Sequence, residues 1–462
     1  MTNREPGIGD GRAAIKRAAV LGAGTMGSQI AGLLADRGIP CDLLDLRSEG
    51  EPDRLAESAR ERLKTLRPSA LVNKDAVELI RPGNLDDHLH RLAEADWVIE
   101  AVSEDLEIKR RVWAGAAPYV SAGAIVSTNT SGIPVSSIAE ALPPELRSRF
   151  LGAHFCNPPR YLPLLEVIAT PDTAPGVVAA VSRIAADVLD RGVVPTHDVP
   201  NFIANRVGAY ALMLMLQAME EFGLAPDEVD SITGPAMGRP SSATFRTLDV
   251  VGIDVFAAVA DNSLAAASDP AEREVLTVPE YLRELVRRGW TGQKAGQGFY
   301  KRVEEGGERR ILTLDLDTFE YRPRKGLAAV SLDAIRNVES PGERIRILVS
   351  HDDAAGRFAW WVLSRTMAYA AAVLGEVADD IVSIDRAMRW GYAWDLGPFE
   401  TWDAIGLGDA VARMRSDGVS LPGWVASLAK SGMSFYREGP DGATQATPDG
   451  GYVPVPPSAL EG

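Results

Sequence analysis

The sequence predicts an α/β N-terminal domain with a mainly parallel sheet, followed by two related all-α domains. Three observations support this prediction. From residue 17 to residue 200, short apolar segments alternate with helical segments, which is the pattern of strands joined by crossover helices. From residue 201 onward the apolar periodicity becomes helical. Within this helical part, three short motifs recur in the same order.

The alternating region is predicted to contribute six strands to one sheet. Each is a short apolar run followed by a stretch long enough for the crossover that a parallel pair needs. Pro200 marks the expected end of this domain, because proline is poorly tolerated inside regular elements. The expected strands are 18–21, 41–44, 97–100, 124–127, 150–153 and 165–168.

Composition and periodicity divide the whole chain into six segments. The two ends are polar or rich in Gly, Pro and Asp, a composition that does not bury a core. The expected helices are 202–222, 248–260, 279–288, 356–374 and 384–390. The expected segments are a disordered tail at 1–16, the α/β domain at 17–200, a helical domain at 201–302, a linker or hairpin at 303–330, a second helical domain at 331–437 and a tail at 438–462.

The two helical domains share three motifs. The longest, FRTLDVVG against FETWDAIG, follows the pattern F-x-T-x-D-x-x-G. The matched segments are 206–211 with 365–370, 245–252 with 399–406, and 298–301 with 434–437. Each match alone could arise by chance, but their common order indicates a duplicated helical domain.

The charge balance and the cysteine content limit the classes of partner. A net charge of −16 argues against nucleic acid or an anionic membrane as the main partner, since both attract basic faces. The two cysteines, Cys41 and Cys156, cannot build a disulfide framework and suit a reducing compartment. The chain shows neither a secretory leader nor an apolar run of about 18 residues, so a cytoplasmic protein is expected.

A glycine-rich loop follows the first predicted strand and opens a helix. Residues 22–27 (GAGTMG) have G-x-G-x-x-G spacing, in which the first glycine allows a tight turn, the second lets a pyrophosphate approach, and the third lets helix and strand pack. The helix start then presents free N–H groups and a positive dipole end to the phosphates. The pattern predicts a Rossmann-type dinucleotide-binding domain. The expected cofactor contacts are Gly22, Gly24, Thr25, Met26 and Gly27.

An acidic residue ends the next predicted strand. Asp45 lies 18 residues after Gly27, where a carboxylate accepts hydrogen bonds from the ribose hydroxyls and repels a 2′-phosphate. NAD is therefore predicted as the cofactor in preference to NADP. Arg47, two residues further on, is the basic residue that could weaken this preference.

A histidine and a glutamate supply candidate acid–base chemistry. His154 closes a predicted strand of the sheet, and Glu166 follows twelve residues later. Oxidation of a secondary alcohol requires a base that takes the hydroxyl proton while hydride leaves, and histidine does this near neutral pH. A carboxylate on the other ring nitrogen fixes the tautomer and stabilises the imidazolium. Cys156, two residues after His154, is a candidate nucleophile, although a buried structural cysteine is the more frequent role.

Polar residues near the ends of predicted strands and at the start of the first helical domain are candidates to hold substrate or cofactor. Ser131, Asn157 and Asn205 are candidate donors to the oxygen that becomes a carbonyl. Glu100 is a candidate near the nicotinamide. Asn129 is a candidate cofactor contact, although a turn or cap role is a strong alternative for this asparagine.

Together these motifs resemble the L-3-hydroxyacyl-CoA dehydrogenase family. The match spans residues 17–301 in the family's order. The matching segments are the loop at 22–27, EAVSE at 100–104, STNTS at 127–131, HFCNP at 154–158, Glu166, NFIANR at 201–206, GRP at 238–240 with TF at 244–245, and GQKAGQGFY at 292–300. The resemblance implies NAD-dependent oxidation of an L-3-hydroxyacyl-CoA to the 3-ketoacyl-CoA, as in fatty-acid β-oxidation.

The resemblance also implies roles for individual residues. His154 is implied as the catalytic base and Glu166 as its partner, while Ser131 and Asn205 bind the substrate oxygen and Asn157 lines the same pocket. The first helical domain is implied to close over the acyl chain of the acyl-CoA thioester. Four basic residues are candidate contacts for the CoA phosphates, although a solvated helix face is at least as frequent for such a cluster. These residues are Arg60, Arg62, Lys64 and Arg67.

The chain departs from the short members of the family. Asn201 stands where they have Gly, His197 stands where they have Lys, and the chain continues beyond residue 300. The continuation resembles a longer branch, in which a dehydrogenase with two helical domains precedes an enoyl-CoA hydratase domain. A stand-alone enzyme, half of a split pair with a separate hydratase, and a truncated form all remain open.

The second helical copy has lost one site residue. Ser364 stands where the first copy has Asn205, so the second copy is predicted to be structural. It is expected to pack on the first copy as a second subunit does in short dimeric relatives, which favours a monomer with one active site. Two other functions remain open: a non-catalytic subunit that binds acyl-CoA or a separate hydratase, and an NAD-dependent dehydrogenase of a free hydroxy acid.

Overall fold

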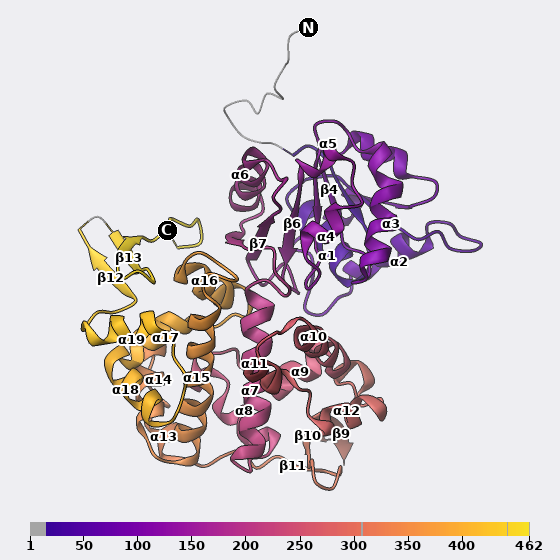
Figure 1. Cartoon of the computed structure of the whole chain (residues 1–462). Helices are drawn as coiled ribbons and strands as arrows, with labels where there is room; N and C mark the ends of the chain where they lie inside the picture. Colours follow the sequence, from indigo (N-terminus) through magenta and orange to yellow (C-terminus); the bar gives the residue numbers. More distant parts are fainter. Residues whose placement is uncertain (1–14, 306–307, 441, 462) are drawn as a thin grey trace. The chain divides into compact units, whose positions relative to one another are not determined.

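The computed structural model describes residues 15–305, 308–440 and 442–461. The chain forms two compact units. The main segment of the first unit ends at Phe202, two residues after the boundary expected at Pro200, and the segment from Pro456 onward also belongs to this unit. The second unit runs from Ile203 to Val455 (Figure 1). The N-terminal tail expected at 1–16 lies almost entirely outside the described residues. Among the described helices, none is long and apolar enough to cross a bilayer.

The first unit is built on one eight-stranded sheet with the strand order β3-β2-β1-β4-β5-β6-β7-β8. Neighbouring strands are parallel except β6 and β7, which pair antiparallel. The strands are β1 (Ala18–Leu21), β2 (Cys41–Asp45), β3 (Ile80–Asn84), β4 (Trp97–Glu100), β5 (Ile125–Thr128), β6 (Phe150–Phe155), β7 (Leu164–Ala169) and β8 (Gly192–Thr196). The predicted α/β class with a mainly parallel sheet is therefore confirmed.

All six predicted strands are present within one or two residues of the expected bounds, and two further strands complete the sheet. The unpredicted strands β3 and β8 lie at the two edges of the sheet. Their sequences, IRPGN and GVVPT, each contain one proline and one glycine, which argue against a strand in a sequence pattern. An edge strand tolerates proline because one side of its backbone makes no ladder hydrogen bonds.

Helices cover both faces of this sheet. In β1, Ala18 and Val20 point into one apolar core, and Ala19 and Leu21 point into the other, as the alternation of side chains in a strand requires. The first core includes residues of α1 (Thr25–Asp36), α2 (Arg54–Leu63) and α6 (Pro175–Arg183). The second includes residues of α3 (Leu106–Ala116), α4 (Val135–Ala139) and α5 (Pro144–Arg147). The sheet is thus buried on both sides, as parallel sheets require.

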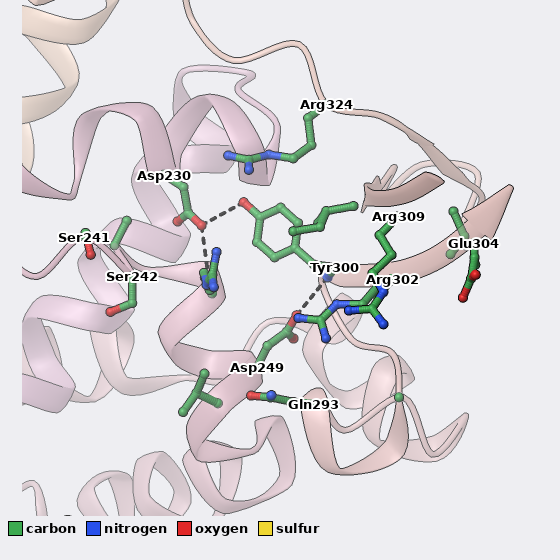
Figure 2. Close-up of a pocket in the computed structure, with 16 residues that line it drawn as sticks. Asp230, Ser241, Ser242, Asp249, Gln293, Tyr300, Arg302, Glu304, Arg309 and Arg324 are labelled. Carbon is green, nitrogen blue, oxygen red and sulfur yellow. Dashed lines mark hydrogen bonds between the residues drawn. The ribbon is translucent and has the colours of Figure 1, made fainter. Parts of the chain in front are cut away.

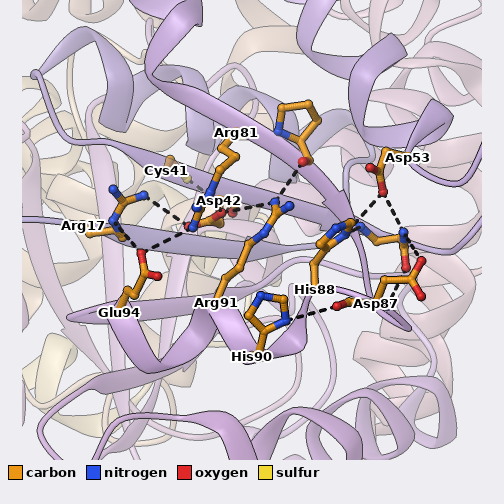
Figure 3. Close-up of polar contacts among 12 residues, drawn as sticks. Arg17, Cys41, Asp42, Asp53, Arg81, Asp87, His88, His90, Arg91 and Glu94 are labelled. Carbon is orange, nitrogen blue, oxygen red and sulfur yellow. Dashed lines mark hydrogen bonds and ion pairs between the residues drawn. The ribbon is translucent and has the colours of Figure 1, made fainter.

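A buried carboxylate on β2 is surrounded by arginines from neighbouring segments of the first unit. Asp42 on β2 is fully buried and accepts hydrogen bonds from Arg81, at 2.5 Å from Nε and 2.9 Å from Nη2 (Figure 3). Arg17 and Arg91 approach the same carboxylate at 3.4 and 3.5 Å. Several cations therefore compensate a charge that burial alone would make very costly.

The second unit is helical with two small sheets. Its first part contains α7 (Ala204–Glu221), α8 (Pro226–Ile232), α9 (Phe245–Val251), α10 (Ile253–Ala266), α11 (Pro270–Leu276), α12 (Glu280–Arg287), β9 (Tyr300–Glu305), β10 (Glu308–Leu314) and β11 (Tyr321–Pro323). Its second part contains α13 (Val330–Ala334), α14 (Pro341–Ser350), α15 (Ala354–Val373), α16 (Ile381–Gly391), α17 (Pro398–Ile405), α18 (Leu407–Ser416), α19 (Gly423–Lys430), β12 (Tyr436–Gly439), β13 (Gly442–Ala446) and β14 (Tyr452–Pro454).

The two parts repeat the same hydrogen-bond pattern, which supports the predicted duplication. In each copy one aspartate accepts from a tyrosine hydroxyl, at 2.7 Å in the first copy and 2.8 Å in the second. A second aspartate accepts from the backbone N–H of that tyrosine, at 2.8 Å in both copies. The corresponding residues are Asp230, Asp249 and Tyr300 in the first copy and Asp385, Asp403 and Tyr436 in the second.

Two expectations about the second unit were wrong. The single helix expected at 248–260 is divided into α9 and α10, because Gly252 adopts φ +107° and ends the first segment. Gly406 divides α17 from α18 in the same way, at φ +105°.

The tail expected at 438–462 contains most of the sheet β12-β13-β14, where the buried Gln445 accepts a hydrogen bond from the backbone N–H of Val382. For segment 303–330, the hairpin alternative is the one the structure shows.

Candidate active site

His154 stands between a carboxylate and a hydroxyl in the first unit. It lies on β6 directly opposite Glu166 on β7, and both side chains are buried. The His154 Nδ1 atom is 2.6 Å from Oε2 of Glu166, and its Nε2 atom is 3.0 Å from Oγ of Ser131. Three of the predicted site residues therefore form one line of hydrogen bonds. With the Nδ1–H directed at Glu166, Nε2 is left as the acceptor and potential base.

The loop that carries Ser131 is held by Glu104, a residue that the sequence analysis did not select. The Glu104 Oε1 atom accepts hydrogen bonds from the backbone N–H groups of Ser131 and Gly132, both at 2.8 Å, and from the Thr130 hydroxyl at 2.6 Å. Burial raises the pKa of Glu104, but the charge of Lys109 and these hydrogen bonds lower it overall below its ordinary value. Glu104 is therefore a carboxylate that positions the Ser131 loop.

Glu100, the acid selected from the sequence, lies deeper. It is fully buried, and its carboxylate accepts hydrogen bonds from Lys109 Nζ at 2.9 Å, the Val102 N–H at 2.8 Å and the Thr128 hydroxyl at 2.7 Å. Lys109 also lies 3.2 Å from Glu104. Glu100 is thus held by three hydrogen bonds, and Glu104 is the more exposed of the two carboxylates. The place of Glu100 near the nicotinamide stays a prediction.

The two candidate asparagines of this unit differ in burial. Asn129 is buried and accepts a hydrogen bond from the Phe155 N–H at 2.9 Å, so it joins the ends of β5 and β6. Asn157 is exposed, and its Oδ1 atom accepts from Gln29 of α1 at 3.2 Å. The structure therefore favours the structural alternative for Asn129. It also brings Gln29, which the sequence did not indicate, into contact with Asn157.

The glycine loop has the shape that a pyrophosphate needs. Gly22 adopts φ +102°, and a Cβ atom there would lie 2.6 Å from the carbonyl oxygen of Ala101. At Gly27 a Cβ would lie 1.9 Å from the Gly22 oxygen, so the first and third glycines are required by packing. At Gly24 nothing lies within 4 Å of the corresponding position, and no side chain caps α1. The open surface therefore lies at the second glycine and the first turn, with Thr25 and Met26, where phosphates bind.

The acidic residue after β2 is held toward this loop. Asp45 accepts hydrogen bonds from the backbone N–H groups of Ala23 at 2.5 Å and Leu46 at 2.6 Å. Arg47 is paired with Asp87, which also accepts from Asn84 at 3.0 Å at the end of β3. Because Arg47 is already paired, it favours a 2′-phosphate less than a free arginine would, which supports NAD as the cofactor.

Cys156 does not have the properties of a nucleophile. Its side chain is buried, and burial together with the charge of Glu166 raises its pKa well above the ordinary value. The thiolate, which is the reactive form, is therefore disfavoured. The structural role considered for Cys156 is the one this geometry supports.

Asn205 and its counterpart differ in accessibility within the second unit. Asn205 is half-buried at the second position of α7. Ser364 is fully buried on α15, and its hydroxyl donates to the backbone oxygen of Trp361 at 3.2 Å. The second copy thus offers no comparable polar group at this position.

The basic residues proposed for CoA phosphates lie on and after α2. Lys64 and Arg60 both pair with Glu61, at 2.9 and 3.2 Å. Arg62 and Arg67 form no ion pair among the described residues, so they are the more available of the four.

Comparisons with known proteins match most of the chain. The model of the 3-hydroxyacyl-CoA dehydrogenase NAD-binding domain matches residues 17–199, and the model of the C-terminal domain of the same family matches residues 202–302. The chain is 44% identical over 439 residues to a probable 3-hydroxyacyl-CoA dehydrogenase of Bacillus subtilis. This alignment covers 91% of this chain and 55% of the relative. It is 32% identical to a putative fatty acid oxidation complex trifunctional enzyme of Rickettsia felis, over 84% of this chain and 52% of the relative.

A solved structure has a similar fold over most of the chain. The 3-hydroxybutyryl-CoA dehydrogenase of Escherichia coli K12 has a TM-score of 0.67 at 23% identity, over 90% of this chain and 99% of that chain. This likeness includes the second helical copy, which lies outside the segments matched by the two family models. The chain spans about half the length of the Bacillus and Rickettsia relatives. From the family models and these identities, the chain belongs to the 3-hydroxyacyl-CoA dehydrogenase family.

Proposed function

We propose that this protein oxidises L-3-hydroxyacyl-CoA thioesters to 3-ketoacyl-CoA thioesters with NAD, as in fatty-acid β-oxidation. The observation that carries the proposal is the line Ser131–His154–Glu166, formed in the same compact unit as the glycine loop. A base, its orienting carboxylate and a hydroxyl on the reacting side are the groups that alcohol oxidation requires.

The protein's own residues account for the movement of the proton. Nε2 of His154 takes the proton from the 3-hydroxyl of the substrate, and Glu166 stabilises the imidazolium that results. Ser131 donates to the oxygen as it becomes a carbonyl, and Asn205 is the proposed second donor. When bound, NAD supplies the hydride acceptor. The open surface at Gly24 and the carboxylate of Asp45 fit this cofactor.

The decisive assay is NADH oxidation with acetoacetyl-CoA and with longer 3-ketoacyl-CoAs. We expect His154→Ala to lower kcat about 10²- to 10⁴-fold while the affinity for NADH stays within about twofold. The matched control is His90→Ala, because His90 is an exposed histidine of the same unit. A near-normal rate for His154→Ala would refute the assigned base. Turnover of free 3-keto acids but of no thioester would favour the free hydroxy acid alternative. NADH binding without any turnover would favour a non-catalytic subunit.

We further propose that the second helical copy replaces the partner subunit of the short relatives and that the protein is a monomer. Helix α7 of the first copy packs against α15 of the second, where the rings of Tyr210 and Tyr369 stack 3.6 Å apart. Light scattering after size exclusion at two concentrations tests this. Any stable dimer would overturn the monomer, and a dimer formed through residues 203–302 would also overturn the replacement of the partner subunit.

A separate enoyl-CoA hydratase is a proposed partner, because the longer branch that the sequence resembles carries a hydratase domain. Co-purification with the purified hydratase tests this.

A further inference from the structure

A cavity of about 560 Å³ lies in the second unit, apart from every residue of the proposed active site. Helix α9 forms one wall, the hairpin β9–β10 forms another, and the segment after β11 closes a third side (Figure 2). Four arginines line it: Arg246 from α9, Arg302 and Arg309 from the hairpin, and Arg324 from the segment after β11. None of the motifs assigned above to catalysis explains this concentration of positive charge.

Among the residues that the structure describes, no carboxylate lies within ion-pair distance of any of these four guanidinium groups. The neighbouring arginines behave differently, since Arg322 pairs with the buried Asp227 at 2.9 Å and Arg287 pairs with Glu280 at 2.7 Å. In a chain with a net charge of −16, four unpaired arginines around one cavity are unusual.

The strand register directs two of these arginines into the cavity. Arg302 lies opposite Ile311, and Glu304 lies opposite Arg309, so these four side chains share one face of the hairpin. Figure 2 shows Arg302 and Arg309 close together on this face. Glu304 forms no ion pair with Arg309 within 4 Å, although the two residues are cross-strand partners.

The two aspartates at the cavity hold elements of the fold together. Asp230 accepts from the Tyr300 hydroxyl at 2.7 Å and from the Phe245 N–H at 2.7 Å. Asp249 accepts from the backbone N–H groups of Phe299 and Tyr300, both at 2.8 Å. Among the described residues, neither carboxylate accepts a hydrogen bond from the side chain of one of the four arginines.

We propose that this cavity binds a small polyphosphate ligand of the nucleoside diphosphate or triphosphate class, at a site separate from the dinucleotide loop. Guanidinium groups bind phosphate oxygens in a planar, bidentate geometry, and the four here come from three segments that surround one space. The hydroxyls of Ser241 and Ser242 add neutral donors. Val250 and Ile311, which are 60% and 38% exposed, offer apolar surface to a base. The volume lies within the range of about 300–1,000 Å³ typical of ligand sites.

The test is isothermal titration of the full chain, saturated with NADH so that the dinucleotide site is occupied. The probes are ADP, tripolyphosphate and coenzyme A. The test variant is Arg302→Glu with Arg309→Glu, because both residues are exposed on the hairpin and carry no hydrogen bond of the fold. The matched control is Arg346→Glu with Arg357→Glu, which changes the net charge equally at exposed positions of the second copy. Circular dichroism verifies that each variant is folded.

We expect ADP or tripolyphosphate to bind with one site per chain, at least about tenfold more weakly in the test variant and within about twofold of the unmodified protein in the control. Tighter binding of ADP than of tripolyphosphate would identify a nucleotide ligand, and equal affinity would identify the phosphate chain alone. If coenzyme A shows the same loss in the test variant, the ADP portion of an acyl-CoA is the source. Equal weakening in the two variants, or no binding of any probe, would overturn the proposal. Binding at this cavity is independent of turnover at His154, which the assay with 3-ketoacyl-CoAs measures.

Discussion

His154 and Glu166 are direct partners across the antiparallel pair β6–β7. The contact between Nδ1 and Oε2, at 2.6 Å, is therefore set by the backbone register of two central strands. A one-residue slip of this pair would point one of the two side chains to the other face of the sheet. The antiparallel pair, an exception in a parallel sheet, is thus the element that aligns the proposed base with its carboxylate.

Replacing the carboxylate while keeping its shape should remove most of the activity. In Glu166→Gln the side-chain amide can donate to Nδ1, which favours the tautomer whose Nε2 carries the proton and cannot accept another. We expect kcat to fall at least about 100-fold, with the affinity for NADH nearly unchanged. Steady-state kinetics with acetoacetyl-CoA and NADH provides the measurement, and Asp172→Asn, an exposed acid after β7, is the control. A rate within threefold of the unmodified protein would show that the carboxylate does not set the tautomer.

Glu104 should act through Ser131. Without its carboxylate, the N–H groups of Ser131 and Gly132 lose their shared acceptor, and the loop is free to move from His154. We expect Glu104→Ala to lower kcat/KM about 10- to 100-fold, and the double variant with Ser131→Ala to lose little more, because coupled residues are not additive. Glu107→Ala is the control, since Glu107 is exposed in the first turn of α3, three residues after Glu104. Full additivity of the two losses would contradict the positioning role.

Cys156 should be dispensable for the chemistry. Its raised pKa leaves little thiolate near neutral pH, so we expect slow alkylation by iodoacetamide in the folded protein and rapid alkylation in denaturant. Cys156→Ser should keep kcat within about threefold. Mass spectrometry after timed alkylation checks the first expectation and kinetics the second. Rapid labelling of the folded protein accompanied by loss of activity would restore the nucleophile hypothesis.

The parts of the site that depend on local pattern could be predicted from the sequence. The spacing and positions of Gly22, Gly24 and Gly27 predict the phosphate loop, because Gly22 and Gly27 leave no room for a Cβ atom and Gly24 leaves open space for a phosphate. His154 and Glu166 could be paired because each lies in a short apolar run of its own. Their opposite positions across the sheet, and the antiparallel direction of the pair, could not be read from composition or periodicity.

What the sequence could not decide depends on three-dimensional packing. Glu100 ends β4 and Glu104 follows four residues later, and their different burial and hydrogen bonds distinguish the fully buried acid from the one that holds Ser131. The edge strand β3 was missed because its proline and glycine are acceptable only at the rim of a sheet. The duplication was predicted from motifs, but the pair Asp230 and Asp385, outside every motif, became visible only through their shared tyrosine hydrogen bond.

The buried carboxyl of Asp249 should make the second unit less stable as pH rises. Because burial raises its pKa in the folded state to about 6, the folded protein binds this proton more tightly than the unfolded chain does. The stabilisation is present at low pH and is lost as pH rises through the folded pKa, by at most about 3 kcal/mol between about pH 4 and pH 7. Urea denaturation of the unmodified protein and of Asp249→Asn measures the difference. A constant difference across this range would show that the carboxyl has an ordinary pKa.

A tyrosine hydroxyl should contribute to the contact between the two helical copies. Arg206, which follows Asn205, donates to Tyr369 of the second copy at 2.7 Å and to Glu272 at 2.8 Å. The Tyr369 hydroxyl in turn donates to Glu272 at 2.5 Å. Tyr369→Phe therefore removes one acceptor and one donor from a buried charged network, which should cost about 2–3 kcal/mol. Hydrogen exchange of α7 and α15, together with the urea midpoint, is the measurement.

Tyr210 supplies the matched control for this change. Its ring stacks on that of Tyr369, but among the described residues its hydroxyl makes no hydrogen bond. Tyr210→Phe should therefore leave exchange in α7 and α15 within about 0.5 kcal/mol of the unmodified protein, because the stacked rings are kept. If the two variants were equally stable, the copies would be held by ring packing, and the network around Arg206 would add nothing measurable. If only Tyr369→Phe loosens α7, the second copy fixes the helix that carries Asn205, which is the part a second subunit is expected to play in the short relatives.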